Sequence, residues 1–196
     1  MLVITSTTTL VPDNPAAAYA AYRQAASAVF LAGTQGLKYK KDHYDLAVDL
    51  SKAGLTYIDE RADEIVIGAM TPLWQIKISQ AIQNFAGGAI SKAISDVADK
   101  NIQRYGTLGG VISSKAPFSV LLPILLSLHV DVQLQDKGCM SLDDYLHCPP
   151  MGELVTGISI AKEAVYTAYK AYRKLPVDEP YLVGAVAMRD DSWRIV

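Results

Sequence analysis

The sequence NIQRYGTLGG, residues 101–110, ends in a glycine-rich turn and decides how the rest of the chain is interpreted. Glycine lacks a Cβ and reaches positive φ, so backbone N–H groups in such a turn can approach an anion closely. Successive N–H groups that point inward form a nest for phosphate oxygens. An earlier turn, AGTQG at residues 32–36, has the same character, and two such turns facing each other would clamp a pyrophosphate. Taken singly, each turn is better explained as an ordinary one.

The spacing of these glycines argues against two common nucleotide-binding motifs. Neither turn has the G-x-G-x-x-G spacing of a Rossmann fold or the Gly-Lys-Ser/Thr ending of a P-loop. We therefore do not expect a nucleotide to bind through either of those folds. The sequence also shows no G-x-S-x-G elbow and no recognisable Ser, His and Asp set, so no side-chain catalytic constellation is expected.

The residues around the first turn predict strands on both sides of a helix. Asp13 or Asn14 can cap a helix that starts at Pro15, where the missing N–H of proline has no cost. Short apolar or alternating segments predict strands here at residues 2–5, 29–32 and 46–50.

The region from Leu55 onward predicts a mixture of hairpins and helices. Ser119 can cap a buried helix that ends near Leu128, and Ser141 can cap a short helix whose first turn holds two aspartates. Residues 107–110 are expected to be a sharp turn. The Tyr-, Lys- and Arg-rich segment 166–174 is interpreted as a solvated amphipathic segment or an interface. Strands are expected at residues 56–59, 65–68, 130–134, 181–188 and 193–196.

The order of these pieces resembles the FAD-binding subunit of the molybdenum hydroxylases, the family of xanthine and carbon monoxide dehydrogenases. The most specific element is residues 102–110, which look like the family's I-R-N-x-x-T-x-G-G-N loop. The resemblance implies an α+β, two-subdomain PCMH-type FAD-binding fold, with FAD extended between subdomains at 1–54 and 55–161. Residues 162–196 would begin a truncated C-terminal subdomain. The other matching segments are 32–36, IGAMT at 67–71, SVLLPILLSL at 119–128, VDVQL at 130–134, SLDDYL at 141–146 and ELVTGISI at 153–160.

The resemblance also implies which residues hold the cofactor. A first pyrophosphate loop, a second pyrophosphate loop and one flavin-side contact are carried over by position. They fall on Leu31, Ala32, Gly33, Thr34 and Gln35, on Thr107, Leu108, Gly109, Gly110 and Val111, and on Ile158.

Three positions depart from the family's pattern. Gln35 stands where the first loop is usually acidic, Val111 replaces the Asn that closes the second loop, and Val120 replaces an aspartate. Each hydrogen bond lost in this way is worth about 1 kcal/mol net, and more where a charge is involved. These departures motivate a second hypothesis, in which the chain is a cofactor-free scaffold that docks partner subunits. A third is that the chain is a fragment whose missing part completes the site.

The function implied by the resemblance is electron transfer through FAD. In such an enzyme a molybdopterin-binding subunit oxidises the substrate, a [2Fe-2S] subunit passes the electrons on, and FAD delivers them to NAD or another acceptor. The isoalloxazine carries the redox chemistry, which agrees with the lack of an acid or base constellation.

Composition excludes several other classes of function. A net charge of -2 gives no basic footprint for nucleic acid, and the longest apolar run, residues 120–128, is far below the roughly 20 residues that a membrane span needs. The first residues lack the basic start of a signal peptide, so a cytoplasmic protein is expected. Cys139 and Cys148 are expected to be reduced, and with the three histidines they show no metal-ligand spacing.

Overall fold

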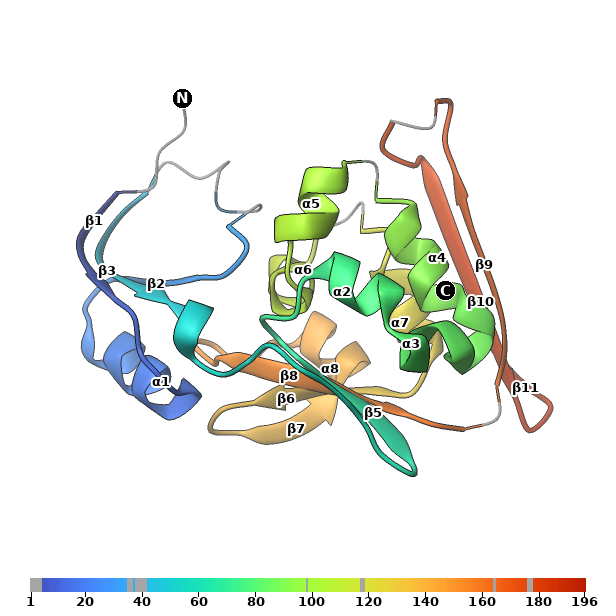
Figure 1. Ribbon diagram of the computed structural model, residues 1–196, viewed down its shortest axis with the longest axis horizontal. Coiled ribbons are helices and arrows are strands. Elements are labelled where there is room, and N and C mark those ends of the chain that lie inside the picture. The colour runs from blue at the N-terminus through green and yellow to red at the C-terminus, as the bar shows by residue number, and fades with distance from the viewer. Residues whose placement is uncertain are drawn as a thin grey trace.

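The computed structural model describes residues 5–34, 37, 42–97, 99–116, 119–163, 165–175 and 178–196. In this part of the chain the strands form three sheets, and helices lie between and against them (Figure 1). The α+β class expected from the sequence is confirmed. Each sheet lies within one of the segments 1–54, 55–161 and 162–196. The division of the chain into subdomains at these boundaries stays a proposal.

The N-terminal sheet has three parallel strands in the order β1-β3-β2, with helix α1 beside them. Asn14 caps α1, because its side-chain oxygen accepts from the Ala17 N–H at 2.8 Å. The first strand differs from the predicted 2–5: residues 2–4 lie outside the described residues, and the strand continues through a threonine run that favours extended backbone. The elements are β1 Thr5–Leu10, α1 Pro15–Gln24, β2 Ala28–Leu31, β3 His43–Asp49 and the 3₁₀ helix η2 Leu50–Lys52.

The central sheet has five antiparallel strands in the order β4-β5-β8-β6-β7. Its last strand in the sequence, β8, lies in the middle and pairs with β5 on one edge and β6 on the other. The predicted strand at 130–134 is confirmed. The strands predicted at 56–59 and 65–68 form a hairpin, β4 with β5. The strands are β4 Ile58–Glu60, β5 Glu64–Gly68, β6 Val130–Leu134, β7 Gly138–Ser141 and β8 Val155–Ala161.

Short helices connect these strands, and most of them lie on one side of the central sheet (Figure 1). Their apolar side chains and those of the sheet form the main core, in which Ile65, Ile94 and Ile158 are completely buried. The helices are α2 Leu73–Ile78, α3 Gln80–Asn84, the 3₁₀ helix η3 Phe85–Gly88, α4 Ala89–Ser95, α5 Lys100–Tyr105, α6 Leu108–Ser114, α7 Leu122–Ser127 and α8 Leu142–His147.

The C-terminal sheet consists of β9 Tyr166–Tyr172, β10 Leu182–Arg189 and β11 Ser192–Ile195, in the order β11-β10-β9. One face packs on α4 and α7, and there Tyr169 is only 5% exposed. Tyr166, on the other face, is 77% exposed. The segment at 166–174, expected to be a solvated amphipathic segment or an interface, is mostly a strand whose alternate side chains point to an exposed and a packed face, and its role as an interface stays a prediction.

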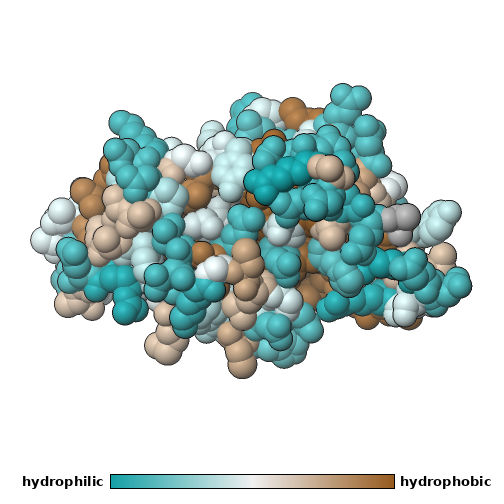
Figure 2. All heavy atoms as spheres, turned by 90° about the horizontal axis from the view of Figure 1, so that it is seen from below, coloured by the Kyte–Doolittle hydropathy of each residue, from teal (hydrophilic) through white to brown (hydrophobic). Residues whose placement is uncertain are grey.

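Many apolar residues are buried, and large apolar side chains also lie on the surface, among them Tyr166, Trp193 and Ile195. Seen from below, the surface is mainly hydrophilic, with apolar residues in small separate groups (Figure 2). Within the described ranges, none of the helices has both the length and the apolar character that crossing a membrane requires. The longest of them, α1, has 10 residues.

Candidate functional site

The two glycine turns of the sequence lie against each other. A Cβ added to Gly33, just after β2, would lie 2.0 Å from the carbonyl oxygen of Tyr105 and 3.1 Å from the Cα of Gly106. Side chains do not tolerate such distances to backbone, so this contact requires glycine at position 33. The two turns therefore lie in direct contact, and the convergence of their amides on a diphosphate stays a prediction. It joins the N-terminal sheet to the segment between α5 and α6.

The first turn leaves β2 in a conformation that favours glycine. Leu31 ends the strand in register with Asp49 of β3, and Ala32 and Gly33 are half-buried. Thr34 is exposed and has a φ of 55°, in the left-handed region that β-branched residues disfavour. Gln35, the fifth residue assigned to this loop, lies outside the described residues.

Replacing Thr34 by glycine is expected to stabilise the protein. The left-handed conformation costs an ordinary residue about 1–2 kcal/mol, and the extra freedom of glycine in the unfolded chain offsets part of the gain. We expect the free energy of unfolding in urea to rise by about 0.5–1 kcal/mol for Thr34→Gly. Thr8→Gly, in the extended backbone of β1, is the matched control and should instead lose about 0.5–1 kcal/mol. Equal losses for both variants would contradict the left-handed assignment.

The second turn is the start of a helix, which corrects the prediction of a sharp turn at 107–110. Helix α6 begins at Leu108 and is capped by Thr107, whose Oγ1 accepts from the Gly110 N–H at 3.2 Å. Threonine at this position satisfies one of the N–H groups that have no partner within the first turn of a helix.

The N–H groups of this turn already have acceptors within the protein. The Leu108 N–H donates to Thr71 O at 3.1 Å, and the Gly109 N–H donates to Ala69 O at 2.8 Å. The Val111 N–H closes the first turn of α6. The expectation that this turn offers a nest of uncommitted amides is therefore wrong, because the connection after β5 supplies carbonyl partners for them.

Glycine in the second turn serves close packing. A Cβ on Gly109 would lie 2.8 Å from the Cβ of Ala69, and one on Gly106 would lie 2.5 Å from the carbonyl oxygen of Ile102. Because these glycines have no side chains, the backbone of the second turn contacts the first turn on one side and the residue after β5, Ala69, on the other.

Three further positions singled out in the sequence are apolar and face the core. Val111 packs against the main core, and Val120 is 7% exposed. Ile158 is the middle of β8, paired with Ile67 and Val132, and has 0% exposure. Its side chain has no free surface to offer a cofactor, so its assignment as a flavin contact stays a prediction without geometric support.

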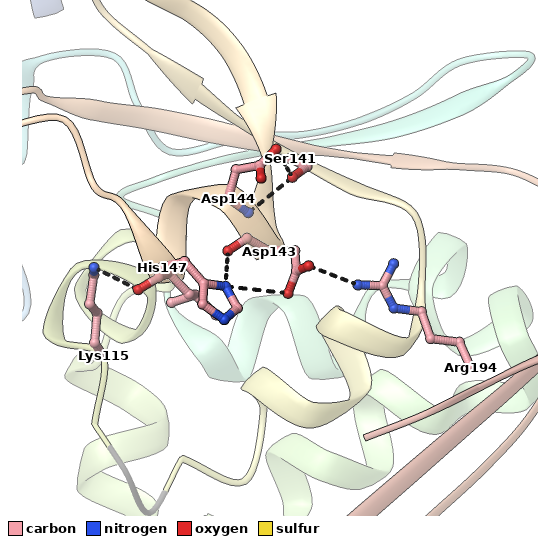
Figure 3. Close-up of polar contacts among 7 residues, drawn as sticks. Lys115, Ser141, Asp143, Asp144, His147 and Arg194 are labelled. Carbon is pink, nitrogen blue, oxygen red and sulfur yellow. Dashed lines mark hydrogen bonds and ion pairs between the residues drawn. The ribbon is translucent and has the colours of Figure 1, made fainter.

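A separate polar cluster surrounds α8 (Figure 3). Ser141 caps the helix by accepting from the Asp144 N–H at 3.0 Å, and Asp143 lies 3.7 Å from the guanidinium of Arg194 in β11. His147 contacts the carbonyl oxygen of Asp143, one turn earlier in the helix, and the Lys115 ammonium donates to Leu146 O near the helix end. The predicted role of the aspartates as helix-start charges is confirmed. A cavity of about 550 Å³ beside this cluster has five carboxylates and one arginine among its fourteen lining residues, an excess of negative charge that suits no phosphate group.

The histidines and cysteines form no metal centre in the part of the chain described. His43 contacts threonines of β1, and His129 lies near Glu163. Cys139 and Cys148 are exposed and not joined in a disulfide. No group of three or more His, Cys, Asp or Glu side chains in the described ranges is arranged to hold a metal ion.

The chain belongs to the family described as the FAD binding domain in molybdopterin dehydrogenase, whose sequence profile matches residues 5–162. This match confirms the resemblance found in the sequence and FAD as the cofactor it implies.

Two relatives, both described as the uncharacterized protein YgfM, come from Escherichia coli strain K12 and Escherichia coli O157:H7. Each is 29% identical over 171 residues, which cover 86% of this chain. The chain spans 64% of the length of these relatives.

Solved structures of a carbon monoxide dehydrogenase and a quinoline oxidoreductase share the fold. Carbon monoxide dehydrogenase from Hydrogenophaga pseudoflava, in a form that lacks the Mo-pyranopterin moiety, superposes with a TM-score of 0.85 at 22% identity, covering 95% of this chain and 72% of that one. Quinoline 2-oxidoreductase from Pseudomonas putida 86 superposes with a TM-score of 0.84 at 18% identity. The match covers 100% of this chain and 73% of that one. At these identities the likeness concerns the fold, and it confirms the predicted fold class.

The residues at the turns fit a bound diphosphate in one respect and depart from it in another. The contact at Gly33 places the first turn directly against the end of α5, so backbone from both turns lies at one place. The amides of the second turn are committed inside the protein, so the first turn must supply most of the backbone donors.

Proposed function

We propose that this chain binds FAD with the cofactor's pyrophosphate at the contact between the two turns. The observation that supports this most is the absence of a Cβ at Gly33, which lets backbone meet backbone at the end of α5. A phosphate group fits such a place because its oxygens need close approach to N–H and O–H donors. In this proposal residues 31–35 form one wall of the clamp and residues 107–111 the other.

Thr107 is the donor that we assign to the second wall. Its Oγ1 accepts a hydrogen bond from the Gly110 N–H, which leaves the hydroxyl hydrogen to donate. Among the described residues we find no acceptor for that hydrogen. The side chain is 5% exposed, so a hydrogen bond from it to a phosphate oxygen would be shielded from water.

The proposed role of the chain is that of an electron-transfer subunit in a molybdopterin-dependent hydroxylase or dehydrogenase. Its proposed partners are a molybdopterin-binding subunit and a [2Fe-2S] subunit, with NAD or another molecule as electron acceptor. FAD supplies the redox chemistry when bound, so the protein contributes binding and orientation. We place the chain in the cytoplasm, where two exposed thiols such as Cys139 and Cys148 stay reduced.

The test is a titration of the purified chain with FAD and, separately, with FMN, followed by flavin absorption and fluorescence. FMN lacks the pyrophosphate, so it cannot use the proposed clamp. Hydrogen bonds to charged groups contribute about 1.5–3 kcal/mol each, so FAD should bind at least about tenfold more tightly than FMN. Equal affinities would contradict the clamp, and the absence of saturable FAD binding would contradict the function.

A second candidate function is that of a cofactor-free scaffold, and the burial of Val111 and Val120 favours it. Both valines are part of or packed against the apolar interior, where the family's pattern has polar residues. The scaffold hypothesis expects this chain to purify from its host with a molybdopterin-binding or [2Fe-2S] subunit and without flavin. Recovery of FAD with the complex would contradict it.

A further inference from the structure

A cavity apart from the two turns has four cationic side chains among the ten residues that line it. It has a volume of about 560 Å³ and lies between α2 and α4, the start of α5 and the end of β9. Four cations, Lys77, Lys100, Arg173 and Lys174, line it together with one carboxylate, Asp96. These residues come from four separate segments of the chain, so the fold itself brings the positive charges together.

The concentration of positive charge is local, because the chain as a whole has a net charge of -2. Arg173 lies 4.0 Å from Asp96, and its side chain is 11% exposed, so that ion pair holds the guanidinium in place. The ammonium groups of Lys77, Lys100 and Lys174 have no ion pair or hydrogen bond with any of the described residues. Three like charges beside one cavity repel one another, and a bound anion would relieve that repulsion.

Two neighbouring polar side chains have hydrogen-bond partners on the backbone. Asp99, next to this cavity in sequence, accepts from the Asn101 N–H at 2.7 Å and so caps α5. Gln103, which lines the cavity, is 9% exposed and donates from its side-chain amide to Val97 O at 2.7 Å. That hydrogen bond ties α5 to the end of the α4 segment and fixes one wall of the cavity.

We infer that this cavity binds a small molecule through a phosphate group. Lysine ammonium and arginine guanidinium groups are the side chains that form charge-assisted hydrogen bonds to phosphate oxygens. The volume is within the range of about 300–1,000 Å³ typical of small-molecule sites. This inference rests on the cations of the cavity and is independent of FAD binding at the turns.

Two-dimensional ¹⁵N NMR of the full 196-residue chain tests the inference, because it locates an anion rather than only detecting it. The probes are inorganic phosphate and AMP, with adenosine as the phosphate-free control and chloride holding the ionic strength constant. We expect saturable shifts at the amides of Asp96, Lys100 and Lys174 with both phosphate probes and none with adenosine. Tighter binding of AMP than of inorganic phosphate would identify a phosphate ester as the ligand; the reverse order would identify free phosphate.

Charge variants separate a built site from general attraction. Lys100→Gln and Lys174→Gln are each expected to weaken phosphate binding about tenfold, as expected for the loss of one charge-assisted contact. Lys137→Gln, in the exposed turn between β6 and β7, is the matched control and should leave binding unchanged. Equal weakening by all three variants would overturn the inference, as would the absence of saturation by inorganic phosphate.

The same spectra distinguish this site from the proposed FAD clamp. Phosphate shifts confined to Gly33, Gly106 and Gly110 would place the anion at the turns and overturn the inference. Gly33→Ala should disturb the turns and leave the phosphate shifts at Lys100 and Lys174 intact. Loss of FAD binding with these shifts retained would show that the two sites are separate.

Discussion

Gly33→Ala is expected to lower the affinity for FAD by about 10- to 100-fold while the three sheets stay folded. The added methyl group would meet the Tyr105 carbonyl oxygen at 2.0 Å, so the two turns must separate by more than an ångström. Forcing a methyl group into a filled contact costs about 1–3 kcal/mol, and 1.4 kcal/mol corresponds to tenfold in affinity. Quenching of flavin fluorescence during titration with the protein measures the dissociation constant.

Gly184→Ala is the matched control, because among the described residues no atom beyond its two chain neighbours lies within 4 Å of the Cβ that it would add. Gly184 is in β10, in the C-terminal sheet, so its substitution should leave FAD affinity as in the parent chain. Far-UV circular dichroism of both variants checks that the sheets have formed. If folded Gly33→Ala binds FAD as tightly as Gly184→Ala, the cofactor does not depend on this contact, and the proposed clamp is incorrect.

The pairing of the two turns could be predicted because glycine itself is the signal. Where backbone meets backbone, as at Gly33 and Gly106, side chains are excluded, and the sequence records the contact as glycine. The partners of the Leu108 and Gly109 amides left no such mark. Carbonyl groups belong to every residue, so nothing in the residue types at 69 and 71 shows that their oxygens accept these hydrogen bonds.

Helix α6 begins within 107–110, residues for which the sequence predicts a sharp turn. Two adjacent glycines, each about 1 kcal/mol less favourable than alanine in a helix, indicate a turn. The structure instead begins a helix at Leu108, because the Thr107 cap and the carbonyls after β5 hold its first N–H groups. The hydrogen bonds to the carbonyls after β5 outweigh the preference of glycine for a turn. Their donors and acceptors lie far apart in the sequence, so a short stretch of sequence around the glycines does not contain both partners.

The C-terminal tyrosines show a second limit of sequence patterns. Tyr166, Tyr169 and Tyr172 recur every three residues, a spacing that puts side chains on one face of a helix. In strand β9 the same spacing puts Tyr169 on the face opposite to the other two. Pairing with β10 and packing against α4 select the strand, and α4 lies far away in the sequence.

Ile158→Ala is expected to lower the free energy of unfolding by about 2–5 kcal/mol, because it opens a cavity at the centre of the main sheet. The side chain is completely buried, and its strand is paired on both edges, so the surrounding residues cannot collapse easily into the space. Ile158→Val removes one methylene group and should cost about 0.5–1.5 kcal/mol. Urea denaturation of the chain without FAD measures both values.

Ile78→Ala makes the same substitution on an isoleucine of α2 that is 57% exposed, and it should change stability by no more than about 0.5 kcal/mol. The comparison separates the core role of Ile158 from the flavin contact implied by the family resemblance. A core role predicts the large loss of stability in the absence of FAD. A flavin contact predicts weaker FAD binding by Ile158→Val, with stability equal to that of the parent chain. The second result would require the β8 strand to expose a side chain that the structure places entirely inside the core.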